Sequence, residues 1–333
     1  MGIKIAFFGS QPYDKTSFEE TNKNYDFDLR FYQGNLSINN ILLTQGCDVV
    51  CIFVNDNANA EVIEQLAKNG VKLLALRCAG FNNVDLEAAE KFGVHVVRVP
   101  AYSPYAVAEH TVALMLALNR RIPRATWRTR DGNFSLNGLL GFDMHGKTAG
   151  IIGTGKIAKI LISILKGFGL NILAYDLFPD TKWAEQEGIT YVTLDELYKN
   201  ADIISLHCPL TDDTKYIIND YSIGKMKDGV MIINTGRGQL INTNALIAGL
   251  KSKKVGWAGL DVYEEEGEYF YQDKSDRIID DDVLARLLSF NNVIVTSHQA
   301  FFTKEALGNI AHTTLQNVQD FIDGKELINK VTL

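Results

Sequence analysis

A glycine-rich segment near the middle of the chain has the residue types needed to hold a diphosphate. The apolar run Thr148 to Ile152 leads into Gly153-Thr-Gly-Lys-Ile-Ala158, and a helical pattern follows. Gly153 permits a tight strand-to-helix turn, Gly155 lets backbone amides approach a pyrophosphate, and Ala158 lets the helix pack closely on the strand. Because the helix N-terminus would then face the diphosphate, the segment predicts a dinucleotide-binding βαβ unit.

A carboxylate after the next apolar run selects between the two nicotinamide cofactors. Asp176 follows Asn171-Ile-Leu-Ala-Tyr175, where it can accept hydrogen bonds from ribose hydroxyls and would repel a 2'-phosphate. We therefore expect NAD rather than NADP. The glycine pattern alone is also typical of ordinary turns, so this prediction depends on the strand, the helix and the acid that surround it.

Three polar residues follow other strand-like runs, where ligands gather in open α/β sheets. Arg237 lies between glycines after Val230 to Asn234, with room for its guanidinium to hold a carboxylate through two hydrogen bonds. His298 follows Val293 to Thr296 and could donate or accept a proton near neutral pH. Glu266 ends an acidic triplet and could favour the protonated imidazole. Together they meet the demands of hydride transfer to a 2-keto acid.

Taken singly, each of these residues also has an ordinary structural interpretation. An arginine in a glycine-flanked turn is often a surface ion-pair partner, a histidine after a strand is often structural, and an acidic triplet is usually solvated. The other histidines compete for the acid–base role, and spacing alone does not exclude His110 or His207.

The rest of the chain alternates strand-like and helical patterns, which indicates parallel sheets. Helical patterns run from Ala60 to Asn69 and from Leu86 to Phe92. Strand-like runs before residue 100 are Ile3 to Phe8, Asp48 to Val54, Val71 to Leu76 and Val94 to Val97. After residue 147 six strands are expected: Thr148 to Ile152, Ile172 to Tyr175, Asp202 to Leu206, Val230 to Ile233, Trp257 to Leu260 and Val293 to Thr296.

Two prolines, Pro100 and Pro104, mark a domain boundary before an apolar helix from Tyr105 to Asn119. A last helical pattern, Lys304 to Ile322, comes too late to extend the second sheet and is long enough to return to the first domain. We expect an α/β protein with two doubly wound parallel-sheet domains joined by two hinge crossings, with a cleft between them. One is discontinuous and flavodoxin-like (1–101 and 300–333), and the other is a Rossmann domain (102–299).

Composition excludes several classes of function. The chain has 333 residues, 46% of them apolar, with a net charge of −7 and a pI near 5.4, which argues against nucleic-acid or membrane partners. The arginine cluster between Arg120 and Arg130 is more simply a solvated helix end or an interface than a phosphate site. Four cysteines without close pairing predict neither a metal site nor disulfides. No export signal or long apolar span is present, so we expect a cytoplasmic protein.

The motifs together resemble the D-isomer-specific 2-hydroxyacid dehydrogenase family over essentially the whole chain. The segments that carry the resemblance are Leu76-Arg-Cys-Ala-Gly-Phe-Asn-Asn-Val-Asp85, Val99-Pro-Ala-Tyr-Ser-Pro104, Ala108-Glu-His110, Gly153-Thr-Gly155, Leu206-His-Cys-Pro209, Thr235-Gly-Arg-Gly238, Asp261-Val-Tyr-Glu264 and Ser297-His-Gln-Ala-Phe-Phe302. The fermentative bacterial D-lactate dehydrogenases are the branch that the chain resembles most. The resemblance implies an NAD-dependent reduction of pyruvate to D-lactate, with the discontinuous domain as the substrate domain.

The resemblance also implies site residues. Arg237 would bind the substrate carboxylate, His298 would be the acid–base, and Glu266 its partner, which selects one member of the acidic triplet. The implied substrate-binding residues are Cys78, Ala79 and Gly80 through their backbone amides, Tyr102 in the pocket wall, and Phe53 over the methyl group. The implied cofactor contacts are Gly153, Thr154, Gly155, Lys156 and Ile157 at the pyrophosphate, Asp176 at the ribose, Cys208 and Pro209 near the adenine, and Thr235 and Asp261 near the nicotinamide.

Some alternatives within the fold are disfavoured and others stay open. Glu266 speaks against a formate dehydrogenase, whose relatives carry glutamine there, and the chain's end at Leu333 against the longer phosphoglycerate dehydrogenases. Phe53 stands where some relatives carry tyrosine, so the polarity of the pocket differs. A bulkier 2-keto acid stays open as the substrate, and an NAD-sensing corepressor is the alternative from another class. Relatives lead us to expect a homo-oligomer, either a dimer or a tetramer.

Overall fold

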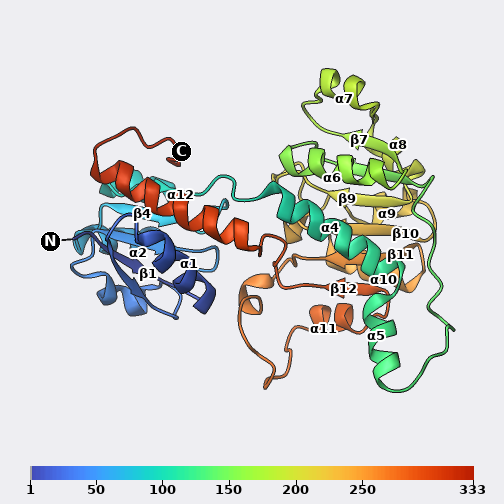
Figure 1. Cartoon of the computed structure of the whole chain (residues 1–333), viewed down its shortest axis with the longest axis horizontal. Helices are drawn as coiled ribbons and strands as arrows, with labels where there is room; N and C mark the ends of the chain where they lie inside the picture. The colour runs from blue at the N-terminus through green and yellow to red at the C-terminus, as the bar shows by residue number, and fades with distance from the viewer. Residues whose placement is uncertain (1) are drawn as a thin grey trace. The chain divides into compact units, whose positions relative to one another are not determined.

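The computed structural model describes residues 2–333, which form two compact units (Figure 1). The first unit takes the chain up to Ser103 and again Phe302–Leu333, and the second takes Pro104–Phe301. Both crossings lie two residues further along the chain than the boundaries expected from the prolines and from the last helical pattern. Each unit is an α/β body with one all-parallel sheet, so the predicted fold class is confirmed.

The first unit contains a five-stranded parallel sheet in the order β2-β1-β3-β4-β5. This is the flavodoxin-like order, in which the chain reverses direction across the sheet between β1 and β3. The elements are β1 (Lys4–Phe7), α1 (Pro12–Asn22), β2 (Asp28–Phe31), η1 (Ile38–Thr44), β3 (Val49–Ile52), α2 (Ala60–Lys68), β4 (Leu73–Leu76), α3 (Leu86–Phe92), β5 (His95–Val97) and α12 (Lys304–Ile322).

Helices cover both faces of this sheet, which is why its central strands read as unbroken apolar runs. All four residues of β3 and of β4 are buried. One face packs against η1, α2 and α3, through side chains such as Ile41, Leu66 and Ala88. On the other side α1 and α12 pack against each other, and α12 also contacts β4, so the last helix completes the first unit (Figure 1).

The second unit contains a seven-stranded parallel sheet in the order β12-β11-β10-β9-β6-β7-β8. Its strands are β6 (Thr148–Ile152), β7 (Asn171–Tyr175), β8 (Thr190–Tyr191), β9 (Ile203–Leu206), β10 (Val230–Asn234), β11 (Val255–Leu260) and β12 (Val293–Val295). Its helices are α4 (Pro104–Asn119), α5 (Ile122–Arg130), α6 (Lys156–Gly167), α7 (Thr181–Glu187), α8 (Leu194–Asn200), α9 (Asp220–Lys225), η2 (Gly238–Leu240), α10 (Thr243–Lys251), η3 (Glu266–Glu268) and α11 (Asp282–Leu288).

Two separate cores hold this sheet between layers of helices. On one face α4, α6 and α7 bury side chains such as Met115 and Leu161, and on the other α8 to α11 bury side chains such as Leu197 and Leu246. The sequence predicted six strands here, and this count was wrong: β8 adds a seventh, in Thr190–Tyr191. Two residues are too few for an alternation to be recognised.

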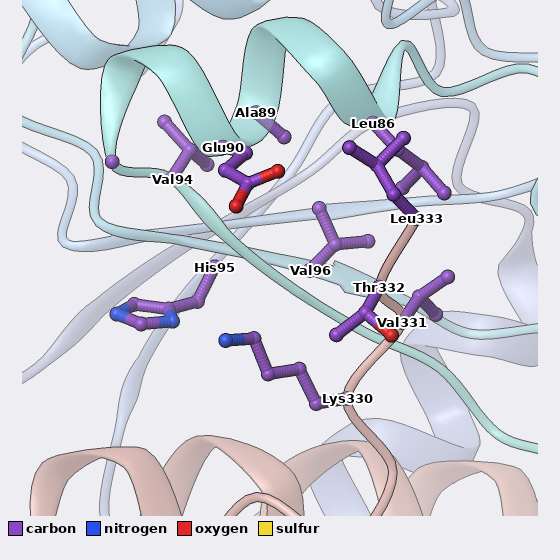
Figure 2. A pocket seen from close by; sticks show the side chains of 11 residues that line it. Leu86, Ala89, Glu90, Val94, His95, Val96, Lys330, Val331, Thr332 and Leu333 are labelled. Carbon is purple, nitrogen blue, oxygen red and sulfur yellow. The ribbon is translucent and has the colours of Figure 1, made fainter.

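The first unit has a cavity of about 300 Å³ between α3, β5 and the segment 330–333 (Figure 2). Apolar side chains such as Leu86, Val96 and Val331 line it, and His95 and Lys330 lie on one side of it. None of the site residues expected from the sequence lines this cavity.

Neither a metal site nor a membrane span is formed by residues 2–333. Cys47, Cys51 and Cys78 are buried free thiols, and Cys208 is partly buried and also free. No group of three or more potential ligand side chains among these residues could hold a metal ion. No helix in the same part of the chain is both long and apolar enough to cross a bilayer.

Candidate active site

Polar residues of the second unit gather where β10, β11 and β12 end. These strands are neighbours in the parallel sheet, so their carboxyl ends lie along one edge. Arg237 follows β10, Asp261 follows β11 directly, and His298 follows β12. This edge is where open α/β sheets bind ligands, and the chain places its candidate acid–base residue there.

His298 and Glu266 form a hydrogen-bonded pair. The Nδ1 atom of His298 lies 2.8 Å from Oε1 of Glu266, and the two side chains are 17% and 24% exposed. The other carboxylate oxygen of Glu266 accepts a hydrogen bond from the backbone amide of Tyr263 at 3.1 Å, which fixes the carboxylate. A carboxylate on Nδ1 stabilises the imidazolium and orients the ring, so Nε2 is the atom that can exchange a proton with a ligand.

The loop that carries His298 is held by Asp261, whose side chain is fully buried. Its carboxylate accepts hydrogen bonds from the hydroxyl of Thr296 (2.5 Å) and from the backbone amides of Gln299 (2.9 Å) and Ala300 (2.8 Å). His298 itself has a φ of +54°, a left-handed conformation that costs free energy for a residue other than glycine. Burial opposes the charged carboxylate, but a hydrogen bond from His110 together with those from Thr296, Ala300 and Gln299 outweighs burial and lowers the pKa of Asp261.

The two competing histidines occupy different positions. Nε2 of His110 lies 3.4 Å from the Asp261 carboxylate and 3.2 Å from the Thr296 hydroxyl, so it supports the same loop from α4. His207 bonds the Ser205 hydroxyl at 2.8 Å, and burial lowers the pKa of His207 to about 4. A neutral imidazole is a poor proton donor near neutral pH, which disfavours His207 as the acid.

Arg237 lies in a turn that requires a glycine at position 238. A Cβ added to Gly238 would overlap the backbone of Tyr263, and the side chain of Asn234 ties the turn by bonding the amide of Gly236 (3.0 Å) and the carbonyl of Arg237 (2.9 Å). The Arg237 guanidinium is exposed and donates to the carbonyl of Gly236 at 2.9 Å. This geometry leaves further guanidinium donors available for a carboxylate ligand.

The glycine-rich turn after β6 has the shape that a dinucleotide requires. Gly153 has a φ of +90°, and a Cβ there would lie 2.5 Å from the backbone nitrogen of Cys208. Gly155 is exposed, has no atom within 4 Å of its would-be Cβ, and precedes the first residue of α6. An open glycine at a helix N-terminus lets backbone amides approach an anion closely, so this turn fits a pyrophosphate.

Asp176 is held beside that turn. Its carboxylate accepts hydrogen bonds from the amide (2.6 Å) and hydroxyl (2.9 Å) of Thr154 and from the amide of Phe178 (2.9 Å). Burial raises the pKa of Asp176, but the bonds from Phe178 and Thr154 outweigh that effect and lower it overall. The carboxylate therefore stays charged at neutral pH, which favours ribose hydroxyls over a 2'-phosphate.

The remaining cofactor candidates surround the same edge of the sheet. Lys156 and Ile157 form the first turn of α6, and Cys208 and Pro209 follow β9. Burial raises the pKa of the Cys208 thiol to about 11, so the thiol is neutral near pH 7. The hydroxyl of Thr235 lies 2.9 Å from that of Thr111 on α4, which holds Thr235 in place after β10.

The expected substrate residues of the first unit follow two adjacent strands and precede the crossing. Phe53 comes after β3, and Cys78 to Gly80 come after β4. The loop is tied internally, because Arg98 donates to the carbonyl of Ala79 at 2.8 Å and the Cys78 thiol to that of Gly80 at 3.3 Å. Tyr102 accepts a bond from Asn309 through its carbonyl at 2.7 Å.

Several residues that support the site were not identified from the sequence. Tyr191 of β8 lies 2.8 Å from the Thr154 hydroxyl, and Asn234 and Thr111 hold the turn after β10. The partners of Tyr191 and Thr111 are distant in the chain, so no local pattern indicates them. Asn234 bonds residues two and three positions further on, a local signal that could have identified it.

Comparison with known proteins identifies the family. The sequence model of the D-isomer specific 2-hydroxyacid dehydrogenase NAD binding domain matches residues 112–300. A 2-hydroxyacid dehydrogenase homolog of Haemophilus influenzae is 54% identical over 99% of this chain and 99% of its own, and the D-lactate dehydrogenase of Escherichia coli is 50% identical over 99% and 100%.

A solved structure of the pyruvate reductase of Chlamydomonas reinhardtii agrees with the sequence matches. It superposes with a TM-score of 0.94 at 46% identity, over 98% of both chains. The family resemblance read from the motifs is thus confirmed, and so is NAD as the cofactor. The protein belongs to the D-isomer-specific 2-hydroxyacid dehydrogenases, and its NAD-binding domain lies within the second unit.

Proposed function

We propose that this protein is an NAD-dependent D-lactate dehydrogenase that reduces pyruvate to D-lactate. The observation that carries the proposal is the His298–Glu266 pair, 2.8 Å apart at the carboxyl edge of the NAD-binding sheet. The chain is 50% identical to the D-lactate dehydrogenase of Escherichia coli over 99% of its length, which supports pyruvate as the substrate.

Each candidate residue has one task in this reaction. The exposed guanidinium of Arg237 binds the carboxylate of pyruvate through two hydrogen bonds, because a planar fork matches a carboxylate. His298 donates from Nε2 to the carbonyl oxygen, which polarises the carbonyl. Bound NADH supplies the hydride. The carbonyl carbon receives it as the carbon–oxygen π bond breaks, and the oxygen takes the proton of His298 to become the alcohol.

Glu266 keeps the proton donor charged before the reaction. Its carboxylate is fixed by the Tyr263 amide and bonds Nδ1, so the positive ring is stabilised where the carbonyl oxygen will develop negative charge. The Asp261 hydrogen bonds hold the loop, so this charge is already in place when the substrate binds.

In this proposal the first unit is the substrate domain. We propose that backbone amides of Cys78, Ala79 and Gly80 also bind the carboxylate, that Tyr102 lines the pocket, and that Phe53 contacts the methyl group. On the cofactor side, Lys156, Ile157, Pro209 and Thr235 would line the NAD site together with the Gly153 turn. Their positions after strands and at a helix N-terminus support these roles.

The test is NADH consumption by the purified full chain with pyruvate, 2-ketobutyrate or 2-ketoisocaproate, with NADPH as the alternative cofactor and chiral analysis of the product. We expect fast turnover on pyruvate with NADH and a D-lactate product. Turnover confined to the longer keto acids would overturn pyruvate as the substrate. Tight NADH binding without turnover on any acid would overturn the enzymatic function.

We also propose that the protein acts as a homo-oligomer in the cytoplasm. Free cysteines are consistent with a reducing compartment. The segment from α5 to residue 143 exposes five large apolar side chains, Ile122, Trp127, Phe134, Leu136 and Leu140, which suits an interface between copies. Light scattering should give a mass above one chain, and Leu140→Asp should lower it; a monomeric wild-type protein would contradict the proposal.

A further inference from the structure

Three neighbouring strands of the first unit end around Phe53. Gly9 lies just beyond β1, Phe53 follows β3 directly, and Arg77 follows β4 directly. The sheet order places β1, β3 and β4 side by side, with the reversal of direction between β1 and β3. Doubly wound sheets bind their ligands outside the strand ends at this point. The side chains that fix Phe53 here therefore shape the place where a ligand is expected.

Phe53 is held at three separate points. The carboxylate of Asp56 accepts a hydrogen bond from its backbone amide at 2.6 Å, and the amide group of Asn83 donates to its carbonyl at 2.9 Å. The guanidinium carbon of Arg77 lies 5.2 Å from the centre of its ring, a cation–π distance. Backbone and ring are thus both constrained, although Phe53 stands outside the strand.

The three side chains that hold Phe53 are themselves fixed. The second oxygen of Asp56 accepts a bond from the amide of Leu36 at 2.5 Å, and Asn83 also donates to the carbonyl of Asp56 at 2.8 Å. Arg77 donates to the carbonyl of Gly9 at 2.9 Å. A move of any one member would disturb the others, so the network acts as one unit.

The buried charge of Arg77 points to a role in positioning. Its side chain is 2% exposed, and its Nε lies 3.5 Å from the carboxylate of Asp14. Neither Nε nor Nη1 has a hydrogen-bond acceptor among the described residues. Apolar residues of similar volume often stabilise a core as well as a buried ion pair does, so stability alone gives little reason for a guanidinium here.

We propose that Arg77, Asp56 and Asn83 are positioning residues that set the preference for the substrate side chain by fixing Phe53. The proposal rests on the proposed function, in which Phe53 contacts the methyl group of pyruvate. A ring held in one place excludes larger side chains, and a shift of about 1 Å at such a contact is enough to change rates by orders of magnitude. Arg77 and Asp56 are buried, so they act through Phe53 and not on the substrate.

The main test replaces Asn83 by alanine in the full chain and compares kcat/KM for pyruvate with that for 2-ketoisocaproate. Loss of both donated bonds frees the Phe53 carbonyl, so the ratio of the two values should fall about tenfold, the scale of discrimination by one or two methylene groups. The affinity for NADH, measured by fluorescence titration, should stay unchanged because the NAD-binding domain lies in the other unit.

Asn69→Ala is the matched control. Asn69 is also half-buried in the first unit and also donates two hydrogen bonds, to the carbonyl of Ile41 (3.0 Å) and the hydroxyl of Thr44 (2.9 Å). Asn69 is the C-cap of α2 and lies just before the start of β4, whereas Phe53 lies where the strands end. The two residues are therefore at opposite ends of the parallel strands. It should lower the melting temperature without changing the substrate ratio, which separates positioning from general destabilisation.

Arg77→Met provides a second, independent variant if Asn83→Ala fails to fold. Methionine keeps much of the volume, and Asp14→Asn is made together with it so that no buried carboxylate is left without its ion-pair partner. The fold should then persist while the Phe53 ring loses its cationic partner. The ratio of kcat/KM for pyruvate to that for 2-ketoisocaproate should also decrease. When Phe53 is already replaced by alanine, neither Asn83→Ala nor Arg77→Met should change this ratio further.

The outcomes separate this proposal from the function on which it rests. Wild-type turnover on pyruvate with a substrate ratio equal in Asn83→Ala, Arg77→Met and Asn69→Ala would overturn the positioning role alone. A wild-type protein without turnover on any 2-keto acid would overturn the proposed function and, with it, this inference.

Discussion

Replacing Glu266 by glutamine should move the pH range of activity downward. The substitution keeps the size of the side chain and removes the charge that faces Nδ1 of His298 at 2.8 Å. Reduction of pyruvate needs the protonated ring, and the carboxylate on Nδ1 stabilises that charged form. The pH at which reduction falls to half its maximum should therefore decrease.

The size of this change follows from the contact. Hydrogen bonds to charged groups contribute about 1.5 to 3 kcal/mol, and the partial exposure of both side chains, 17% and 24%, places this pair at the low end. Since about 1.4 kcal/mol corresponds to one pH unit, the midpoint should fall by roughly one unit. Oxidation of D-lactate needs the neutral ring, so its acidic limit should move down by the same amount.

The assay is kcat/KM against pH in both directions, with a second variant as control. Glu265→Gln removes a charge of the same sign from the adjacent, exposed residue and should leave both profiles in place. If Glu266→Gln folds and binds NADH but keeps the wild-type midpoints in both directions, the proposed role of this carboxylate is wrong.

Three further predictions concern the anchor, the cofactor turn and the His298 loop. Arg237→Lys should raise KM for pyruvate and lower kcat, because an ammonium cannot form the two-point fork; unaltered kinetics would contradict anchoring. Gly153→Ala should lower the melting temperature, since a Cβ there would lie 2.5 Å from the Cys208 nitrogen, whereas Gly155→Ala should weaken NADH binding without changing stability. Asp261 has a lowered pKa in the folded protein, so its contribution to stability is present above about pH 4, the unfolded value, and is lost as the pH falls further. Asp261→Asn should therefore have a lower melting temperature than wild type at neutral pH, and the difference, measured by calorimetry, should become smaller in acid. A difference in melting temperature that does not depend on pH would contradict the stabilising role of the Asp261 charge.

The fold was predictable where burial dictates the residue types. Strands such as β3 and β6, enclosed by helices on both sides, are unbroken apolar runs and were located to within about two residues. The prediction was less complete near the N-terminus, where helix α1 and strand β2 were missed. Helix α1 buries only Asp14 and Phe18, and β2 has no fully buried residue, so neither has the periodicity that indicates an element.

The candidate site residues could be proposed from the sequence where function requires a residue type next to a strand end. Arg237, His298 and the glycine turn have that position, and the pattern identified them. The choice of Glu266 over its two acidic neighbours came from the family resemblance, because a loop after a strand has no spacing rule. Asn83 was not identified, since its partner Phe53 lies 30 residues earlier and only the fold brings them together. Asp56 was not identified either, because its bond to the Phe53 amide is a turn contact that many loop aspartates make.

The position of α12 has a consequence for synthesis of the chain. This helix packs against α1 and β4, yet it is encoded after the whole second unit. The first unit is therefore translated in two parts, and one face of its sheet is covered only in part, by α1, until Lys304–Ile322 has left the ribosome. Domains generally fold as they emerge, so the order should be inverted here: the second unit can complete its core first, and the unit that begins the chain folds last.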